Sequence, residues 1–255
     1  MGFEANARSR WYLSTIAADA APVALAYGLG IEITEFCMAT NLDVDYDPWG
    51  IAARTKAEGI KHLTFHAPFA ELCPAAVDPL VLEVTRRRYI QSYEMARSFG
   101  TSRMIVHTGY IPNIYDYSYF VEHSAMFWRS LLAELGDGCE LLLENVFDET
   151  PDLFVNIVRE VADPRLRICL DVGHANLKAS MKPVEEWVAL AAPYLAHLHV
   201  HNNFGNEDAH YLPGIGSIDM PKIVSMAMGL CPDMTVTFEC RDAQGAVDWL
   251  LAQGF

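Results

Sequence analysis

The stretch HLHVHNNFGNEDAH, residues 197–210, holds four of the nine histidines of the chain. Side chains of a β-strand alternate between its two faces, so His197, His199 and His201 share one face if the stretch begins as a strand. Imidazoles close to a carboxylate such as Asp208 are ligands that zinc and related divalent metals favour. We therefore expect a metal site here, with His199 as the best-placed ligand, His197 one layer deeper in the core and His201 at the strand edge, in contact with substrate.

A histidine or a carboxylate also ends most of the other short apolar runs. Six run ends, with the histidine that follows one of them after three positions, are His66, His107, Glu144, Asp171, His174, His199 and Glu239. Such groups are costly to desolvate when they converge, and a divalent cation relieves that cost. Each residue alone has an ordinary explanation as a hydrogen-bonded polar group, but the set predicts a site for zinc, manganese, cobalt or iron. Asp208 and His210 are either further ligands or part of a solvated loop. Their spacing alone favours the solvated loop.

The runs that carry these residues read as eight β-strands. Their ranges are 11–16, 30–37, 61–67, 103–109, 140–146, 167–174, 195–201 and 234–240. Amphipathic stretches between them predict helices. One helix is expected over residues 79–99, with Gly100 suited to its end, another over about 152–162 with Asp152 as N-cap, and the last over about 243–253.

Alternating strands and helices imply parallel pairing through right-handed crossovers. The simplest closed arrangement is a single (β/α)8 barrel, whose strands all end at the face where the active site lies. An open doubly wound sheet is the alternative, but it would normally carry a glycine-rich turn after its first strand, and residues 14–22 contain no glycine. No linker or low-complexity tract divides the chain, so we expect one domain over residues 1–255.

Composition limits the classes of partner. The chain has 18 Lys and Arg against 33 Asp and Glu, a formal net charge of −15, which disfavours a nucleic-acid surface. No apolar run reaches the length of a membrane span, and the N-terminus makes a poor signal peptide, so we expect a cytoplasmic protein. The six cysteines include no C-x-x-C pair and are expected to be reduced thiols packed in apolar surroundings.

The order of six motifs resembles that of the xylose isomerase-like TIM barrel superfamily, which includes sugar and sugar-phosphate isomerases and epimerases as well as endonuclease IV. The motifs are FHAP, IVHTG, LLLEN, CLDVGH, HLHVHNN with the following DAHYLPGIGSID, and FEC. The resemblance covers the chain from about residue 62 to the C-terminus, and residues 11–37 fit the first two strands of the same barrel.

Resemblance to the ketose epimerase and isomerase branch implies one Mn or Co ion held by Glu144, Asp171, His199 and Glu239. In that branch the two glutamates also move a proton to and from a sugar, which makes Glu144 and Glu239 the expected catalytic residues. His174 would hydrogen-bond the substrate, and His66 and His201 would line the same pocket. This metal-dependent sugar isomerase or epimerase, acting on a small carbohydrate, is the leading hypothesis.

Resemblance to the endonuclease IV branch implies three zinc ions and phosphoester hydrolysis as the alternative. Its nine ligands match in type and order, namely His66, His107, Glu144, Asp171, His174, His199, Asp208, His210 and Glu239. The number of ions is therefore expected to be one to three. A multinuclear oxygenase or lyase, and a barrel that only binds a carbohydrate, also stay open.

Three further features bear on these hypotheses. The epimerase branch usually carries an arginine shortly after the histidine that matches His199, and this chain has none there. Asn202 stands where an aspartate is common in the superfamily. The aromatic stretch over residues 110–120 is either a lid over the site or a surface that packs on a neighbouring subunit. Barrels of this group often associate, so a homo-oligomer is possible.

Overall fold

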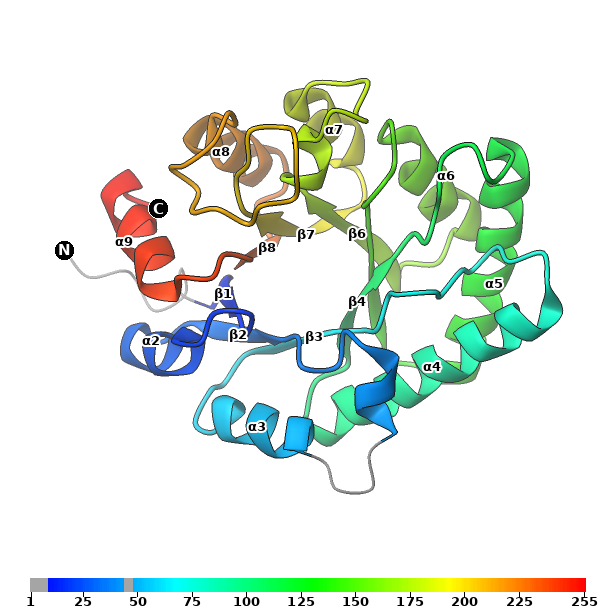
Figure 1. Cartoon of the computed structure of the whole chain (residues 1–255), viewed down its shortest axis with the longest axis horizontal. Coiled ribbons are helices and arrows are strands. Elements are labelled where there is room, and N and C mark those ends of the chain that lie inside the picture. Colours follow the sequence, from blue (N-terminus) through cyan, green and yellow to red (C-terminus); the bar gives the residue numbers. More distant parts are fainter. Residues whose placement is uncertain (1–8, 44–47) are drawn as a thin grey trace.

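A computed structural model of the chain describes residues 9–43 and 48–255, and it confirms the predicted (β/α)8 barrel. Eight parallel strands pair in chain order and close into a barrel (Figure 1). The strands are β1 (Trp11–Ser14), β2 (Gly30–Ile33), β3 (Leu63–His66), β4 (Arg103–His107), β5 (Glu140–Glu144), β6 (Leu166–Asp171), β7 (Leu195–Val200) and β8 (Thr235–Phe238). Each lies within, or within one residue of, a run that the sequence predicts. The first eight residues, part of the N-terminal segment in which no signal peptide is expected, lie outside the described residues.

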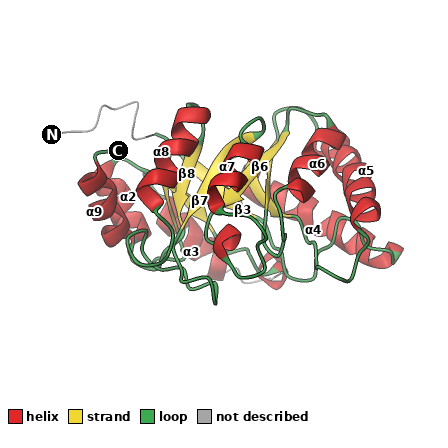
Figure 2. Ribbon diagram, turned by 90° about the horizontal axis from the view of Figure 1, so that it is seen from above, coloured by secondary structure: helices red, strands yellow, loops and turns green. Residues whose placement is uncertain are grey.

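Helices surround the strands and cover the outer surface of the barrel (Figure 2). The α-helices are α2 (Ala20–Tyr27), α3 (Pro48–Ala57), α4 (Pro79–Ser98), α5 (Tyr117–Leu135), α6 (Asp152–Val161), α7 (Val184–Ala191), α8 (Met220–Leu230) and α9 (Ala243–Gln253). Two short 3₁₀ helices, η1 (Ala39–Leu42) and η2 (His174–Asn176), lie in loops at the carboxyl ends of the strands. No helix in the described ranges combines the length and apolar character that crossing a bilayer requires.

Helix ends follow the local sequence with one correction. Asp78 caps α4 by accepting a hydrogen bond from the Leu80 amide at 2.8 Å, and Gly100 follows the helix with a φ of 85°. The prediction that Asp152 is the N-cap of α6 is wrong, because Asp152 is already the first helical residue. Pro151 takes the cap position, and its side chain has no hydrogen-bonding atom to offer.

The two ends of the chain close the barrel. Strand β1 pairs with β8 in register Tyr12 to Thr237. The carboxylate of Asp19, in the first loop, accepts hydrogen bonds from the amides of Ala243 and Gln244 at 3.1 and 3.0 Å. Because these amides begin α9, the first loop of the chain stabilises its last helix.

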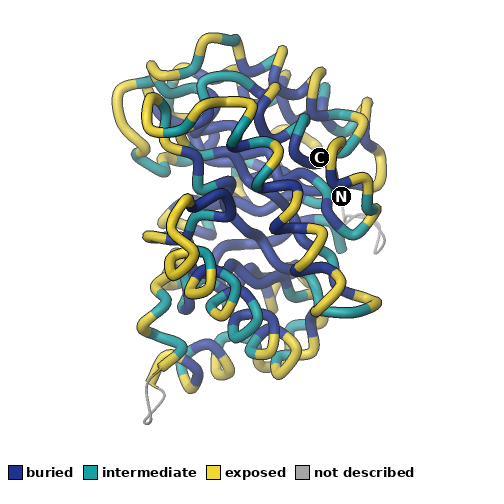
Figure 3. The backbone as a smooth tube through the Cα atoms, turned by 90° about the vertical axis from the view of Figure 1, so that its right-hand side faces the viewer, coloured by how far each residue is buried: buried dark blue, intermediate teal, exposed yellow. Residues whose placement is uncertain are grey.

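The strands direct apolar side chains outward and mostly polar side chains into the barrel. On β2, Ile31 and Ile33 belong to the main hydrophobic core, whereas the buried Glu32 between them bonds with Thr237 across the barrel at 2.9 Å. A second, small apolar cluster consists of Ile105, Leu142, Cys169 and Ala196. Buried strands pass through the middle of the molecule (Figure 3). The interior of this barrel is therefore mostly polar beneath the site, unlike the aliphatic filling usual for the fold.

Candidate metal centre

All nine predicted ligand residues converge at the carboxyl ends of the strands. Together with His201 they make up three of the five groups of potential ligands among the described residues, in each of which the donor atoms lie within 4.8 Å of one another. The first group is His66, His107 and Glu144; the second is Glu144, Asp171, His199 and Glu239; the third is His174, His201, Asp208 and His210. Glu144 belongs to two groups, so the first and second are joined through one carboxylate.

The first group is a compact triangle. The Nε2 atoms of His66 and His107 each lie 3.3 Å from Oε2 of Glu144, and they lie 3.3 Å from each other. Ligands about 2.0–2.1 Å from a tetrahedral zinc ion are about 3.3 Å apart, so this spacing matches a zinc-sized ion.

The second group surrounds His199 at the bottom of the site. Its Nδ1 atom lies 3.3 Å from Glu144 Oε1, 3.4 Å from Glu239 Oε2 and 3.8 Å from Asp171 Oδ2. Asp171 and His199 are fully buried, and Glu144 is almost so. Three carboxylates around one imidazole nitrogen form a strongly negative, oxygen-rich set, of the kind that holds a divalent cation.

The third group joins the loop after β7 to the end of β6. Asp208 Oδ2 lies 3.2 Å from His174 Nε2 and 3.1 Å from His210 Nε2. His201 is fully buried, bonds with Asp171 through Nε2 at 3.1 Å and stacks on the ring of His210. Asp208 and His210 thus lie beside other donors, although their spacing alone favours a solvated loop. His201 is not among the residues that line the open cavity, so its contact with substrate stays a prediction.

Backbone carbonyl oxygens orient three of the histidines. Nδ1 of His66 lies 2.9 Å from the Ala67 carbonyl, Nδ1 of His174 lies 2.8 Å from the Asn145 carbonyl, and Nδ1 of His210 lies 2.6 Å from the Glu239 carbonyl. A carbonyl oxygen only accepts, so in each ring the anchored nitrogen carries the proton. When such a ring is neutral, the Nε2 atom that faces the site carries the lone pair that can bind a cation, which is the arrangement found for metal-bound histidines.

Several buried polar atoms at the site lack hydrogen-bond partners among the described residues. They include Glu144 Oε2, His199 Nδ1 and His201 Nδ1. Leaving a buried polar atom unpaired costs about 1–3 kcal/mol, and more when the group is charged. Two of the three atoms face the first and second groups, so these residues fit a bound cation.

Burial and neighbouring charges shift the pKa values of several residues of the site. Burial works against ionisation of Glu144, but His199 and His107 outweigh it and hold the pKa of Glu144 well below its ordinary value. Burial raises the pKa of Glu239, with His199 opposing the rise only in part. The pKa of His210 is raised to about 9, because Asp208 and Glu239 outweigh the effect of burial.

Glu32, on β2, belongs to the site although the sequence prediction missed it. It is fully buried, and its Oε2 atom lies 3.2 Å from His199 Nε2, on the side of the ring away from the second group. The same atom lies 3.4 Å from Nε2 of His197, the histidine predicted to lie one layer deeper. The alternation GIEI contains a signal for this, because a lone acid between two core isoleucines must point into the barrel.

Two asparagines hold together the segments that carry the candidate ligands. The side chain of Asn145 donates to the Asp171 carbonyl at 3.0 Å and accepts from the Asp171 amide at 2.9 Å. Asn202 donates to the carbonyls of Pro213 and Ile218 and accepts from the amide of Ile218. An ionised aspartate could not donate these bonds. The asparagine that replaces the usual aspartate here therefore stabilises the loop that carries the third group.

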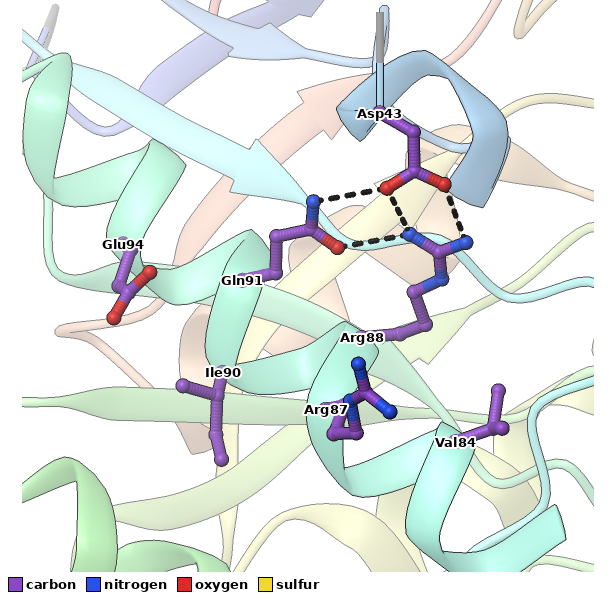
Figure 4. Close-up of a pocket in the computed structure, with 7 residues that line it drawn as sticks. All are labelled: Asp43, Val84, Arg87, Arg88, Ile90, Gln91 and Glu94. Atoms are coloured by element: carbon purple, nitrogen blue, oxygen red, sulfur yellow. Dashed lines mark hydrogen bonds and ion pairs between the residues drawn. The ribbon is translucent and has the colours of Figure 1, made fainter. Parts of the chain in front are cut away.

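An open cavity of about 470 Å³ lies above the three groups. Its walls include site residues such as Glu144 and Glu239 together with Phe69, Val146 and Phe147. No lysine or arginine lines it among the described residues. Arginines line a different cavity of similar size between η1 and α4, where Arg88 pairs with Asp43 (Figure 4). That cavity contains none of the nine ligand residues.

Asp148 is a buried carboxyl beside the cavity wall, and it should make the stability of the folded protein depend on pH. It accepts hydrogen bonds from the Thr108 hydroxyl and the Val146 amide, both at 3.0 Å, and burial raises its pKa to about 6. An unfolded aspartate has a pKa of about 3.9, so between these values the folded state binds more protons and loses stability as pH rises.

We therefore expect Asp148→Asn to raise the melting temperature at pH 8, by an amount that corresponds to about 3 kcal/mol, and to have little effect near pH 4. Thermal unfolding of both proteins between pH 4 and pH 8 measures this. Asp152→Asn, an exposed change shortly after it in the chain, is the control. An advantage that stays constant over this range would show that Asp148 does not titrate as described.

The family assignment agrees with this geometry. Residues 23–251 match the xylose isomerase-like TIM barrel family, and the chain belongs to it. The uncharacterized protein MJ1311 of Methanocaldococcus jannaschii is 26% identical over 194 residues, 72% of this chain and 66% of that protein, so the match spans just under two thirds of this relative.

Two solved structures show the same fold over nearly the whole chain. A D-tagatose 3-epimerase-like protein superposes with a TM-score of 0.76 at 21% identity, over 96% of each chain. The TTHB071 protein from Thermus thermophilus, in a crystal soaked with ZnCl2, superposes with a TM-score of 0.73 at 25% identity, over 96% of this chain and 97% of that one.

Proposed function

We propose that this chain is a divalent-metal-dependent isomerase or epimerase of a small sugar. The observation that carries the proposal is the pair of buried glutamates, Glu144 on β5 and Glu239 after β8, whose carboxylates approach the same nitrogen of His199 from different strands. The fold shared with a D-tagatose 3-epimerase-like protein supports it. In this proposal Glu144, Asp171, His199 and Glu239 hold the central ion, and the zinc-soaked relative makes zinc the first metal to test, before manganese, cobalt and iron.

The bound ion would polarise the carbonyl and hydroxyl oxygens of the sugar and so acidify the neighbouring C–H bond. The chain supplies the proton transfers. Glu144, whose lowered pKa keeps it a carboxylate, removes the proton through a carboxylate oxygen. Glu239, whose pKa is raised by burial, takes up a solvent proton more readily than Glu144 does and returns a proton from the other side. His174, whose ring is oriented by the Asn145 carbonyl, hydrogen-bonds a sugar hydroxyl in this proposal.

The cavity favours a small carbohydrate substrate. A volume of about 470 Å³ suits a monosaccharide or a small derivative of one. Because no lysine or arginine lines it among the described residues, and the chain carries a net charge of −15, a polyanion such as nucleic acid is disfavoured. Three expectations remain predictions: a single domain, a cytoplasmic location and association into a homo-oligomer.

The test is hydrogen exchange in deuterated water. Metal-loaded protein incubated with a panel of ketoses should incorporate one deuterium at a carbon next to the carbonyl, detected by NMR and mass spectrometry. Glu239→Gln should retain its metal better than Glu144→Gln does and yet lose the exchange. Absence of exchange with every ketose in the panel, at full metal occupancy, would contradict the proposal.

Phosphoester hydrolysis is a second candidate, because the first and third groups offer more ligands than a single ion uses. Sites with several metals suit in-line displacement at phosphorus. Zinc-loaded protein should then cleave a small phosphodiester such as bis(4-nitrophenyl) phosphate, and cleave an abasic-site oligonucleotide more slowly. A protein that binds one ion per chain and cleaves neither would leave only the first candidate.

A further inference from the structure

A second cavity, of about 420 Å³, opens beside the metal centre on the side of β3, β4 and β5. We call it the annex, and its main lining residues are Phe69, Leu72, Val81, Tyr110, Ile111 and Phe147. The annex and the metal cavity share Phe69, His107, Val146 and Phe147 in their walls. A ligand that contacts the first group can therefore extend into the annex without leaving the protein.

The wall between the two cavities is aromatic. The Phe69 ring stacks on the His107 ring, with centroids 4.5 Å apart and planes inclined by 13°. Phe69 remains 39% exposed and Phe147 56% exposed, which is unusual for phenylalanine side chains beside a buried polar cluster. Covering these faces would remove apolar surface from water at the point where the cavities meet.

The annex offers few polar partners to a ligand. Cys73 and Tyr115 bond with each other at 3.4 Å, and Tyr110 packs against Phe120 in the core. The stretch over residues 110–120, predicted to be a lid or a subunit contact, thus forms a wall of the annex. Glu71 is the only acid that lines the annex among the described residues, and this residue is exposed. Hydroxyl groups of a second sugar ring would find almost no partners here.

Two of the loops that form the annex are in close contact. Gly109 has a φ of 68°, and a β-carbon there would lie 2.7 Å from the Leu72 carbonyl oxygen. Only glycine allows the loop after β4 to lie this close to the loop after β3. The cavity is therefore part of the fold and does not need a ligand to create it.

From these observations we infer that the annex is a binding subsite for an apolar substituent, an aryl or alkyl group attached to the polar part that occupies the metal cavity. The inference rests on the proposed function and narrows its substrate class to sugars that carry such a substituent. A second copy of the chain covering the same exposed apolar residues is the alternative occupant.

The test uses ligands whose polar part binds metal without turnover. Dissociation constants of acetohydroxamate and phenylacetohydroxamate are measured by calorimetry on the zinc-loaded protein. The hydroxamate occupies the metal centre in both, and only the second carries a ring. We expect the phenyl compound to bind at least about tenfold more tightly, because its ring buries apolar surface in the annex.

Three variants locate the effect. Val81→Trp fills the annex and Phe147→Ala removes one of its walls, so each should reduce the ratio of the two dissociation constants towards one. Leu80→Trp is the matched control, because Leu80 is 70% exposed on the same helix and lines neither cavity, and it should preserve the ratio.

Equal affinities in the wild type overturn the inference, and so does the failure of both hydroxamates to bind. A dimer that Val81→Trp dissociates, seen by sedimentation velocity, would identify a second copy as the occupant and also overturn it. Hydroxamate binding is independent of catalysis, so the inference can stand if no ketose exchanges, or fail while exchange is observed.

Discussion

Glu144→Gln is expected to remove metal from two groups at once and to lower turnover by about 10³-fold, the range for loss of a general base. The carboxylate contributes Oε2 to the first group, 3.3 Å from both His66 and His107, and Oε1 to the second, 3.3 Å from His199. Glutamine keeps the size of the side chain but loses the charge and replaces one acceptor oxygen by a donor.

Elemental analysis of metal per chain measures this directly. His107→Ala is the matched control, because His107 belongs to the first group alone. If the wild type binds two or three ions, Glu144→Gln should lose about one more ion than His107→Ala. If the wild type binds one, His107→Ala should keep it and Glu144→Gln should lose it. Equal losses in the two variants would show that Glu144 does not serve both groups.

The positions of these candidate ligands could be predicted because the barrel brings residues that are far apart along the chain close together. His66, His107, Glu144, Asp171 and Glu239 each follow a short apolar run, and parallel strands of a barrel all end on one face. Neither step requires knowledge of the side-chain packing. Asp208 and His210 needed the resemblance, because a loop between a strand and a helix has no periodicity to read.

The annex and the role of Asn202 could not be predicted in the same way. Phe69, Tyr110 and Phe147 come from three loops, and nothing in their local sequence shows that they enclose a common space. The bonds from Asn202 to Pro213 and Ile218 depend on how residues 202–218 fold back over the barrel. Such contacts depend on the tertiary structure, whereas the alternation around Glu32 is local and could have been recognised.

Glu32 is the residue whose replacement tests how the barrel interior supports the metal centre. Its carboxylate accepts from the Thr237 hydroxyl at 2.9 Å and lies 3.2 Å from His199 Nε2. A proton held on Nε2 by this carboxylate leaves Nδ1, which faces Glu144, Asp171 and Glu239, free to bind a cation. The negative charge of Glu32 next to Nε2 also makes the Nδ1 atom of His199 a stronger electron-pair donor to a bound cation.

We therefore expect Glu32→Gln to weaken zinc binding at the second group by about 10–100-fold, the usual effect of losing a carboxylate behind a metal-bound histidine. Competition with a chromophoric chelator measures the dissociation constant without any substrate. Glu140→Gln is the control, since Glu140 also lies on a barrel strand but pairs with Arg103, at 3.2 Å, away from His199. Glu32→Asp, which keeps the charge, should retain more affinity than Glu32→Gln. Unchanged zinc binding in Glu32→Gln would mean that Thr237 and the neutral His197, whose pKa is lowered to about 3 by burial, suffice to hold this side of the site.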